Sequence, residues 1–392
     1  MKVLMLTSSY PIEGSNLGPF IQNIVKGLVN NGVEVGVMIF SSSKKYKEYK
    51  KDGATIYEYP YTHVLTPMLH KNRGLIPSVK SSFIAKIELL GYFFSTVKYL
   101  RKISKKYDIV HAHWFLPSGL IACLLKNSIR KPIITTAWGA EFHLPKNFIV
   151  KKILNYVNKK SDVKIAVSKY MKSKAKEYGL DVREIKLITN SVDIKQFSLK
   201  RERLNKIIIA TVRRLVPEKR VQDLINAVAD LPNDLKSKIN LWIVGDGPEK
   251  ERLVKLAKTK KIDKITKFWG MVPHKEIPKL LSKVDIYVNP SIQEGMATAN
   301  LEAMAAGACV VATDGFGNDE VIDNGKNGFL YPSQNIGKLS ILISSLINSK
   351  SLRQNISKNA RKRATYFSIQ SVSLNYISYY KTLLFNHSSN NL

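Results

Sequence analysis

The sequence predicts an α/β protein built from two domains, each organised around a parallel sheet. The chain has 392 residues, which exceeds what one ordinary α/β core needs and suits two cores. A short apolar strand opens the chain at Met1–Thr7, a glycine-containing loop follows, and helical sequence runs from about Ile21 to Asn30. The same order of strand, loop and helix begins again at Ile207–Val212. Two Rossmann-like domains are therefore expected.

The first domain is expected to cover residues 1–197. Its further strands are predicted from short apolar runs at Val33–Phe40, Asp108–His113, Pro132–Thr136, Ser161–Ser168 and Lys186–Thr189. Between the first two of these strands, Ser41–Asp52 holds a run of lysines, which is typical of a solvated loop. The spacing from Gly14 to Gly18 in the first loop is not that of the dinucleotide fingerprint, so NAD binding gains little support.

The segment Ser82–Ile103 is predicted to form a basic amphipathic helix with two apolar stripes. The first stripe has the 4-3-4-3 spacing of one helix face. It contains Phe83, Ile87, Leu90, Phe94 and Val97, and the second contains Leu89, Tyr92, Phe93 and Leu100. Basic residues from Lys98 to Lys106 flank both stripes. Because core packing explains one stripe more easily than two, we expect this helix to contact an anionic membrane surface.

Charge and hydropathy restrict the partners. The chain has 62 Lys and Arg residues against 30 Asp and Glu, a formal net charge of +32, which favours a polyanion such as nucleic acid, an anionic membrane or a polyphosphate-bearing substrate. No apolar run approaches the roughly 18 to 20 residues of a membrane span, and the apolar stretch at the N-terminus is too short for a secretory signal. We therefore expect no transmembrane segment and a cytoplasmic location, with peripheral association at the cytoplasmic face of the membrane.

The most informative stretch is Ile286–Cys309. It has the pattern of a strand, a turn and an alanine-rich helix that should begin near Ala297 or Thr298. The unpaired N–H groups and positive dipole end of such a helix predict an anion site, and at the mouth of a parallel sheet that anion is a phosphate or diphosphate. Glu294 in the loop and Glu302 in the helix would then accept hydrogen bonds from hydroxyl groups of the same ligand.

Two basic residues after the strand Ile207–Val212 could serve the same ligand. Arg214 and Lys219 are expected at the exit of this strand, beside a helix N-terminus. Arginine can bind two phosphate oxygens at once, and lysine supplies a mobile point charge. Such a pair could stabilise a departing diphosphate.

Residues 290–314, PSIQEGMATANLEAMAAGACVVATD, resemble the donor-site signature of the retaining, nucleotide-sugar-dependent glycosyltransferases of family 4. These enzymes have the GT-B fold, in which two Rossmann-like domains face each other across a cleft. The resemblance implies an N-terminal acceptor domain at 1–197 and a donor domain at 206–368, with Ser198–Lys206 as the linker. The terminal helix, about residues 369–386, would cross back to the N-terminal domain.

The resemblance implies transfer of a sugar from a nucleoside-diphosphate sugar, here expected to be a UDP-sugar, to a hydroxyl of a lipid-linked or polysaccharide acceptor in cell-surface glycan synthesis. Glu294 would hold a hydroxyl of the transferred sugar and stabilise the transition state, and Glu302 would hold the ribose. Arg214 and Lys219 would neutralise the diphosphate. The further donor-binding residues would be Gly295, Met296, Ala297, Thr298, Ala299 and Val272.

The resemblance also identifies departures in this chain. Related enzymes carry His-Gly-x-Asp after the fourth strand, where this chain has Trp138-Gly139-Ala140-Glu141. Tryptophan cannot accept a proton, although it can stack on a sugar face or donate through its indole N–H. Arg213 stands where the family usually has glycine. On the acceptor side, the resemblance implies Gly14, Ser15, Gly18, Trp138 and Glu141.

No cofactor and no metal are expected. The chain contains no Asp-x-Asp, and the histidines near its strand ends lack the spacing of a known metal motif. Charges of the protein would then take the place of a divalent cation. A catalytically inactive sugar-nucleotide-binding homologue and a nucleotide-sugar epimerase on the same fold remain open alternatives. Nucleic acid is not an expected partner, because the paired glutamates would repel phosphates and no known nucleic-acid module is recognised.

Overall fold

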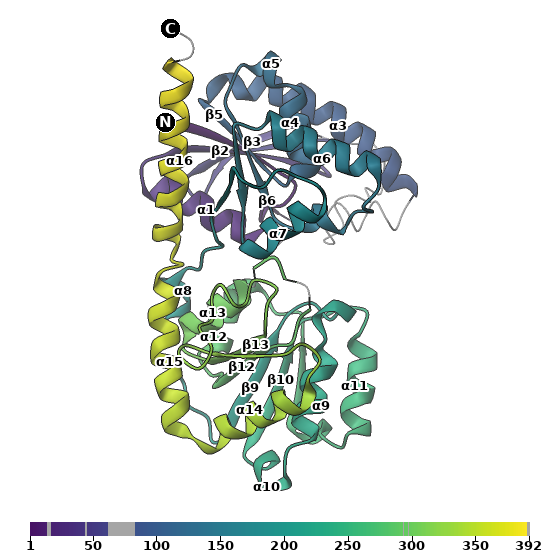
Figure 1. The fold of residues 1–392 in the computed structure, drawn as a ribbon, viewed down its shortest axis with the longest axis vertical. Coiled ribbons are helices and arrows are strands. Elements are labelled where there is room, and N and C mark those ends of the chain that lie inside the picture. The colour runs from purple at the N-terminus through teal and green to yellow at the C-terminus, as the bar shows by residue number, and fades with distance from the viewer. Residues whose placement is uncertain (14–16, 44, 62–82, 293, 297, 390–392) are drawn as a thin grey trace. The chain divides into compact units, whose positions relative to one another are not determined.

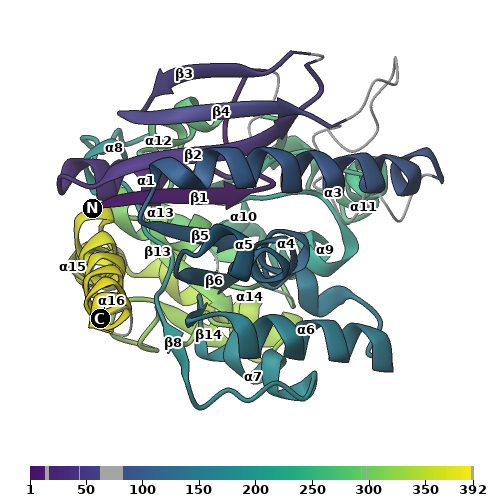
Figure 2. The ribbon, with the colours of Figure 1, turned by 90° about the horizontal axis from the view of Figure 1, so that it is seen from above.

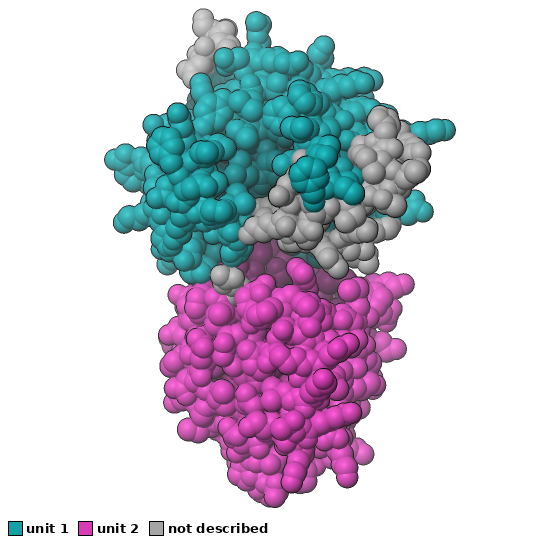
Figure 3. All heavy atoms as spheres, turned by 90° about the vertical axis from the view of Figure 1, so that its right-hand side faces the viewer, with its two compact units in different colours: residues 1–189, 369–392 teal, residues 190–368 magenta. Residues whose placement is uncertain are grey.

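The computed structural model describes residues 1–13, 17–43, 45–61, 83–292, 294–296 and 298–389. The chain forms two compact units, which Figure 3 colours separately. The first unit consists of Met1–Thr189 and Ile369–Leu392, and the second of Asn190–Ser368. Each unit is a parallel sheet covered by helices, as Figure 1 shows, so the prediction of two α/β domains is confirmed.

The sheet of the first unit has the order β3-β4-β2-β1-β5-β6-β7-β8, and all its pairings are parallel except that of β3 with β4. Its strands are β1 (Lys2–Thr7), β2 (Glu34–Ser41), β3 (Lys47–Lys51), β4 (Ala54–Pro60), β5 (Ile109–His113), β6 (Ile133–Ala137), β7 (Val163–Ala166) and β8 (Ile185–Leu187). Its helices are α1 (Pro19–Asn30), α3 (Phe83–Ile103), α4 (Leu120–Leu124), α5 (Lys126–Ile129), α6 (Phe148–Lys160), α7 (Lys169–Glu177) and α16 (Ile369–Ser389).

The two faces of this sheet bury different helices, because successive residues of a strand point to opposite sides. Leu4 and Leu6 of β1 pack in the cluster that contains residues of α3, which crosses the sheet in Figure 2. Val3 and Met5 pack in the cluster that contains residues of α1 and α16. The C-terminal helix therefore completes the core of the first unit.

The lysine-rich segment after β2 differs from the expected loop, since Lys47–Lys51 forms β3 and pairs antiparallel with β4. The two strands are joined at Asp52-Gly53, whose φ angles are 54° and 77°. Positive φ at both central residues is what a tight hairpin turn requires, and Asp-Gly supplies it. The lysines occupy a strand at the edge of the sheet, where charged side chains remain solvated.

The sheet of the second unit has the order β11-β10-β9-β12-β13-β14 and is parallel throughout. Its strands are β9 (Ile207–Val212), β10 (Ile239–Val244), β11 (Thr266–Gly270), β12 (Ile286–Asn289), β13 (Cys309–Thr313) and β14 (Phe329–Tyr331). Its helices are α8 (Ile194–Phe197), α9 (Val221–Ala229), α10 (Asn233–Lys236), α11 (Lys250–Thr259), α12 (Ile277–Leu281), α13 (Thr298–Ala306), α14 (Ile336–Asn348) and α15 (Lys350–Thr365).

The boundary between the units lies between Thr189 and Asn190, before the predicted end of the first domain at residue 197. The intervening residues pack with the second unit, because Val192 and Phe197 are buried in its core. The segment Ser198–Lys206, expected as a linker, is likewise part of the second unit. In the part of the chain that the structure describes, no helix is long and apolar enough to cross a membrane.

Candidate active site

Two loops of the second unit meet at the carboxyl edge of its sheet. One follows β9 and the other follows β12, and these strands are neighbours in the sheet. The backbone N–H of Ile292 donates to the carbonyl of Glu218 at 3.1 Å, which joins the loops directly. Ligands of open parallel sheets bind at this edge.

A carboxylate and two cations form the centre of the site. The Nζ atom of Lys219 lies 2.9 Å from Oε1 of Glu294, and Nη1 of Arg213 lies 3.6 Å from the same oxygen. Burial would raise the pKa of Glu294, but the charges of Lys219 and Arg213 outweigh it and hold the pKa below its ordinary value. Glu294 is therefore ionised at neutral pH, and it is the point at which both cations converge.

Arg213 is fixed in place by its other contacts. It donates from Nε to Thr211 Oγ1 at 2.7 Å and from Nη1 to Asn289 Oδ1 at 2.7 Å, and its side chain is 4% exposed. Sequence reasoning predicted Arg214 here and left open which arginine points inward. Arg214 is exposed and has no hydrogen bond or ion pair with the described residues. Consecutive residues of an extended segment point to opposite sides, so the structure brings Arg213, and not Arg214, to Glu294.

A chain of buried amides holds the second loop, and sequence reasoning missed it. Asn289 donates to Asn300 Oδ1 at 2.9 Å, Asn300 donates to Asn318 Oδ1 at 2.8 Å, and Asn318 donates to the carbonyl of Thr313 at 2.9 Å. The chain links β12, α13 and β13. Because buried amides are costly to leave unpaired, this network fixes the base of the loop that carries Glu294.

The second predicted carboxylate, Glu302, lies in α13, which begins at Thr298. Its side chain is 10% exposed, and its Oε1 atom is 2.9 Å from Nε2 of His274 in the loop before α12. The histidine was not predicted. Asn190 donates to the carbonyl of Met296 at 3.0 Å and to Thr298 Oγ1 at 3.1 Å, and so fixes the start of α13.

The other predicted donor residues take different places. Val272 is half-buried and packs against the core beneath the site. Gly295 and Ala299 are half-buried on either side of the start of α13. Ala297 lies outside the described residues. No group of three or more His, Cys, Asp or Glu side chains that could share a metal ion is found among the residues described.

A glycine with positive φ lets a third loop lie against Arg213. Gly245 follows β10 with φ of 129°, and a Cβ atom there would lie 1.8 Å from the carbonyl oxygen of Arg213. A side chain at position 245 would therefore displace the backbone that carries both arginines.

Two sequence families match the chain. Residues 193–363 match the glycosyl transferases group 1, and residues 18–196 match the Glycosyltransferase Family 4. The chain is a family 4 glycosyltransferase. An uncharacterized glycosyltransferase of Methanocaldococcus jannaschii is 28% identical over 371 residues, which cover 94% of each chain.

Solved structures confirm that the glycosyltransferase has the GT-B fold. Sucrose-phosphate synthase from Thermosynechococcus elongatus is similar with a TM-score of 0.81 and 17% identity, covering 98% of this chain and 99% of that one. HepE from Anabaena, solved in complex with UDP-glucose, is similar with a TM-score of 0.74 and 18% identity, covering 97% and 100%.

In the first unit of the glycosyltransferase, three of the residues predicted for the acceptor side can be placed. Gly18 has φ of 82° and begins α1, where a Cβ atom would lie 2.5 Å from the carbonyl oxygen of Ser9. The indole N–H of Trp138 donates to Nδ1 of His113 at 3.3 Å, so that donor is already used. Gly14 and Ser15 lie outside the described residues.

Glu141, the last residue predicted on that side, is fully buried. Its oxygens accept from the backbone N–H groups of Gly139 at 2.9 Å, Phe115 at 3.2 Å and Trp138 at 3.3 Å. Burial raises the pKa of Glu141 to about 6, although these N–H groups oppose the shift. The glycosyltransferase therefore uses this carboxylate to hold the turn after β6.

Proposed function

We propose that this glycosyltransferase transfers a sugar from a nucleoside-diphosphate sugar, a UDP-sugar, to a hydroxyl of a lipid-linked or polysaccharide acceptor in cell-surface glycan synthesis, with retention of anomeric configuration. The observation that carries the proposal is the convergence of Lys219 and Arg213 on Glu294 at the carboxyl edge of the second sheet. Three charged groups fixed at a ligand-binding edge suit the recognition of a polar, multiply charged substrate.

The carboxylates and cations would each contact a different part of the donor. Glu302, in α13, would accept hydrogen bonds from the ribose hydroxyls. Glu294 would hold a hydroxyl of the transferred sugar, and its negative charge would stabilise the positive charge that develops at the anomeric carbon. Lys219 and the exposed Arg214 would contact the diphosphate. Arg213, which is already held by protein groups, would position Glu294 rather than bind phosphate.

The reaction breaks the bond between the anomeric carbon and the diphosphate oxygen and forms a bond from that carbon to the acceptor oxygen on the same face. The acceptor proton leaves with the diphosphate, whose oxygen is its nearest base. Positive side chains that lower the energy of the departing diphosphate do so without a divalent cation, so we propose that no metal and no other cofactor are required. The UDP-glucose complex of HepE, a protein of the same fold, supports a UDP-sugar.

The surface of α3 supports a membrane-bound acceptor. Tyr92 and Leu100 are fully buried against the first sheet, whereas Phe83, Leu90 and Phe94 are 74%, 63% and 67% exposed. The second predicted stripe therefore packs on the core, whereas the first faces solvent except at Val97, which is half-buried against the core.

The exposed stripe of α3 continues into positive charge along the same helix face. Lys98 and Arg101 are exposed; Lys98 follows Phe94 by four residues, and Arg101 follows Lys98 by three, so all three lie on one helix face. A helix with apolar residues at one end and basic residues at the other suits the interface of an anionic bilayer. We therefore propose peripheral association of the enzyme with the cytoplasmic face of a membrane.

The donor assignment is tested by thermal shift of the purified protein with UDP, GDP, ADP and their sugar conjugates, in EDTA and then with magnesium. A binder raises the unfolding temperature by mass action, so we expect a shift with UDP and UDP-sugars in EDTA. Glu302→Ala should weaken that shift, and the matched Glu251→Gln variant on α11 should not. No shift with any nucleotide, or a shift only with magnesium, would overturn the assignment of the metal-free donor site.

The stereochemistry is tested on the product. Transfer to a synthetic acceptor should give the anomeric configuration of the donor, which proton NMR reads from the coupling of the anomeric proton. An inverted product would contradict the retaining mechanism.

Membrane association is tested by co-sedimentation with phosphatidylglycerol vesicles. Phe94→Ser combined with Lys98→Ser and Arg101→Ser should release the protein, because both the apolar and the basic contact are lost. A control, Lys159→Ser with Lys160→Ser at the end of α6, removes exposed charge from another helix of the same unit. Sedimentation that is unchanged in the α3 variant, or equally reduced in the control, would exclude this surface as the anchor.

A further inference from the structure

The second unit has a basic pocket at the amino edge of its sheet, opposite the edge that carries Glu294. The pocket has a volume of about 600 Å3. It lies where three neighbouring strands begin, since its lining includes Ile207 of β9, Asp285 before β12 and Gly307 before β13. Strand β9 separates the two edges, and its length at about 3.3 Å per residue is about 20 Å. The pocket is therefore distinct from the candidate active site.

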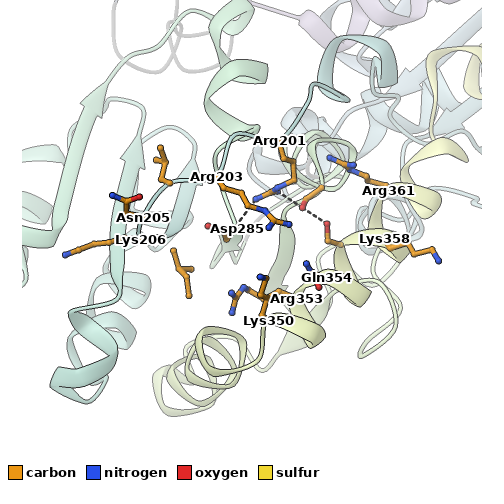
Figure 4. Close-up of a pocket in the computed structure, with 14 residues that line it drawn as sticks. Arg201, Arg203, Asn205, Lys206, Asp285, Lys350, Arg353, Gln354, Lys358 and Arg361 are labelled. Carbon is orange, nitrogen blue, oxygen red and sulfur yellow. Dashed lines mark hydrogen bonds and ion pairs between the residues drawn. The ribbon is translucent and has the colours of Figure 1, made fainter.

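Positive side chains dominate this pocket, which is drawn in Figure 4. Its basic residues are Arg201, Arg203, Lys206, Lys350, Arg353, Lys358 and Arg361. Asp285 is the one carboxylate among the described residues that line it. In Figure 4 the side chains of Arg201, Arg203, Lys350 and Arg353 gather around the centre, whereas those of Lys206 and Lys358 point outward. The centre therefore carries a large positive excess.

Three of the arginines have a structural role that explains their presence. Arg201 donates to the carbonyl of Gly307 at 2.6 Å, and Arg361 donates to that of Ala306 at 3.1 Å, both at the end of α13. Arg353 donates to the carbonyl of Ile347 at 3.0 Å near the end of α14. Helix carboxyl ends leave such carbonyls unpaired and attract cations. These contacts hold the guanidinium groups in fixed positions.

The same contacts do not remove the positive charge, because a backbone carbonyl carries no net charge. The single carboxylate, Asp285, pairs with Arg201 at 3.0 Å. Burial lowers the pKa of Arg201, and the charges of Arg361 and Arg203 add to that effect, while Asp285 opposes it. The positive groups thus repel one another across the pocket.

Two further basic residues have no structural role in the part of the chain described. Arg203 and Lys350 are exposed, and neither has a hydrogen bond or ion pair with any described residue. Helix-end capping therefore does not account for them. They add charge to a pocket that is already repulsive, which is unfavourable unless a counter-ion binds there.

We propose that this pocket binds an anion that carries two or more phosphate groups. Guanidinium groups held by carbonyls are preorganised to donate to phosphate oxygens, and Arg203 and Lys350 are available to close over the ligand. The volume admits a chain of phosphates or a phosphorylated headgroup and exceeds what a single phosphate fills. The ligand can arrive as a free oligophosphate or as the headgroup of an anionic lipid, and both present the same chemistry.

The test is calorimetric titration of the protein with inorganic tripolyphosphate. Arg203→Ser combined with Lys350→Ser should weaken binding at this site at least tenfold and should keep the fold, because both side chains are exposed and neither forms a hydrogen bond or ion pair with the described residues. The matched control, Lys255→Ser with Lys258→Ser on α11, removes the same charge from another exposed surface of the unit. It should change the affinity less than threefold.

Because tripolyphosphate can also enter the active site, Lys219→Ala is titrated in parallel. The active-site variant should retain the binding that the pocket variant loses, which separates this proposal from the proposed function. An unchanged isotherm in the pocket variant, or an equal loss in the α11 control, would overturn the proposal.

A second arm identifies the source of the phosphates. Vesicles that contain cardiolipin, whose headgroup carries two phosphate groups, are compared with tripolyphosphate for the wild type, the pocket variant and the α11 control. Loss of vesicle binding in the pocket variant alone would show that the anion is presented by a lipid. Loss of tripolyphosphate binding with unchanged vesicle binding would show that the pocket binds an anion that is free in solution. If the pocket variant matches the wild type in both arms, the pocket binds no phosphate.

Discussion

The two edges of the second sheet hold arginine and lysine side chains in opposite ways. At the carboxyl edge, Arg213 and Lys219 converge on the ionised Glu294, and an asparagine network supports the loop that carries it. At the amino edge, Arg201, Arg353 and Arg361 are held mainly by backbone carbonyls, and one carboxylate serves the whole pocket.

This difference shows that a contact can hold a cation in place without neutralising its charge. A carboxylate holds the cation and also neutralises its charge, and the cation lowers the pKa of the carboxylate. A carbonyl fixes the guanidinium and leaves the charge in place. The cations of the carboxyl edge are therefore partly neutralised before the substrate binds, whereas in our proposal those of the amino edge are neutralised by a bound anion. The predictions below test each half of this statement.

The largest effect is expected at the carboxyl edge. Glu294→Gln keeps the shape of the side chain and removes its charge, so it should reduce sugar transfer on the order of 1,000-fold, equivalent to about 4 kcal/mol of transition-state stabilisation. Affinity for the nucleotide should change less than about threefold. The rate of sugar transfer is measured from initial rates, and the affinity for the nucleotide is measured by calorimetry. Transfer near the wild-type rate would remove Glu294 from the mechanism.

Substitutions of the two adjacent arginines should differ in their effects on stability and on the rate of sugar transfer. Arg213→Gln should lower the free energy of unfolding by about 2–3 kcal/mol, because it leaves buried hydrogen-bond partners and a carboxylate without their cation. Arg214→Gln should change stability by less than about 0.5 kcal/mol, since it is exposed, yet lower transfer on the order of 100-fold. Urea unfolding and initial rates are measured for both. Equal effects on stability would contradict the division of roles.

Substitution of Gly307 tests whether Arg361 is held in a fixed position at the amino edge. Gly307 has φ of 81°, and a Cβ atom there would lie 2.4 Å from Nε of Arg361, so Gly307→Ala should displace that arginine. Gly325→Ala is the control, because φ is 76° and nothing lies within 4 Å. Both should lose roughly 1–2 kcal/mol to backbone strain, and Gly307→Ala about 1 kcal/mol more. Identical urea midpoints would show that Arg361 is not held against this glycine.

Acid should weaken the ion pairs of Glu294 at the carboxyl edge, and this is the smallest of the expected effects. The pKa of Glu294 is lower in the folded protein than in the unfolded chain. Its contribution to stability is therefore complete above the ordinary pKa of 4.5 and is lost as pH falls through the folded pKa. Between pH 7 and pH 3.5 the wild type should therefore lose more stability than Glu294→Gln.

The amino-edge variant provides the comparison for the acid experiment. Arg203→Ser with Lys350→Ser should follow the wild-type dependence on pH, because these substitutions leave Glu294 and its two cations unchanged. The free energy of unfolding in urea is measured at both pH values for all three proteins. A pocket variant that departs from the wild type in acid would contradict the independence of the two edges.

Local patterns in the sequence predicted most of the elements and placed Glu294 in a loop and Glu302 in a helix. The strand, loop and helix around Glu294 and Glu302 are visible in consecutive residues, and so α13 begins at Thr298 as expected. The hairpin of β3 and β4 was not predicted although its Asp52-Gly53 turn is equally local, because a run of lysines is more typical of a solvated loop than of a strand.

Other features depend on contacts between distant parts of the chain. The choice between Arg213 and Arg214 is decided by the direction of one side chain at the end of β9 and by its partner Asn289. The asparagine network joins residues up to 29 positions apart. The basic pocket combines a segment near residue 201 with α15, and no motif in either segment indicates the other. The two stripes of α3 were visible in the sequence, but only packing showed which of them is buried.

The place of α16 in the fold has a consequence for synthesis of the protein. Tyr376 and Tyr380 fill the core beside α1, and Nδ1 of the buried His111 lies 2.7 Å from the hydroxyl of Tyr380. Residues 190–368 form the second unit in one continuous stretch, so they can fold as soon as they leave the ribosome. Most of the first unit is made earlier, but the apolar surface that α16 covers stays exposed until this last helix has been made. The half of the protein that is translated first is thus the half that finishes folding last.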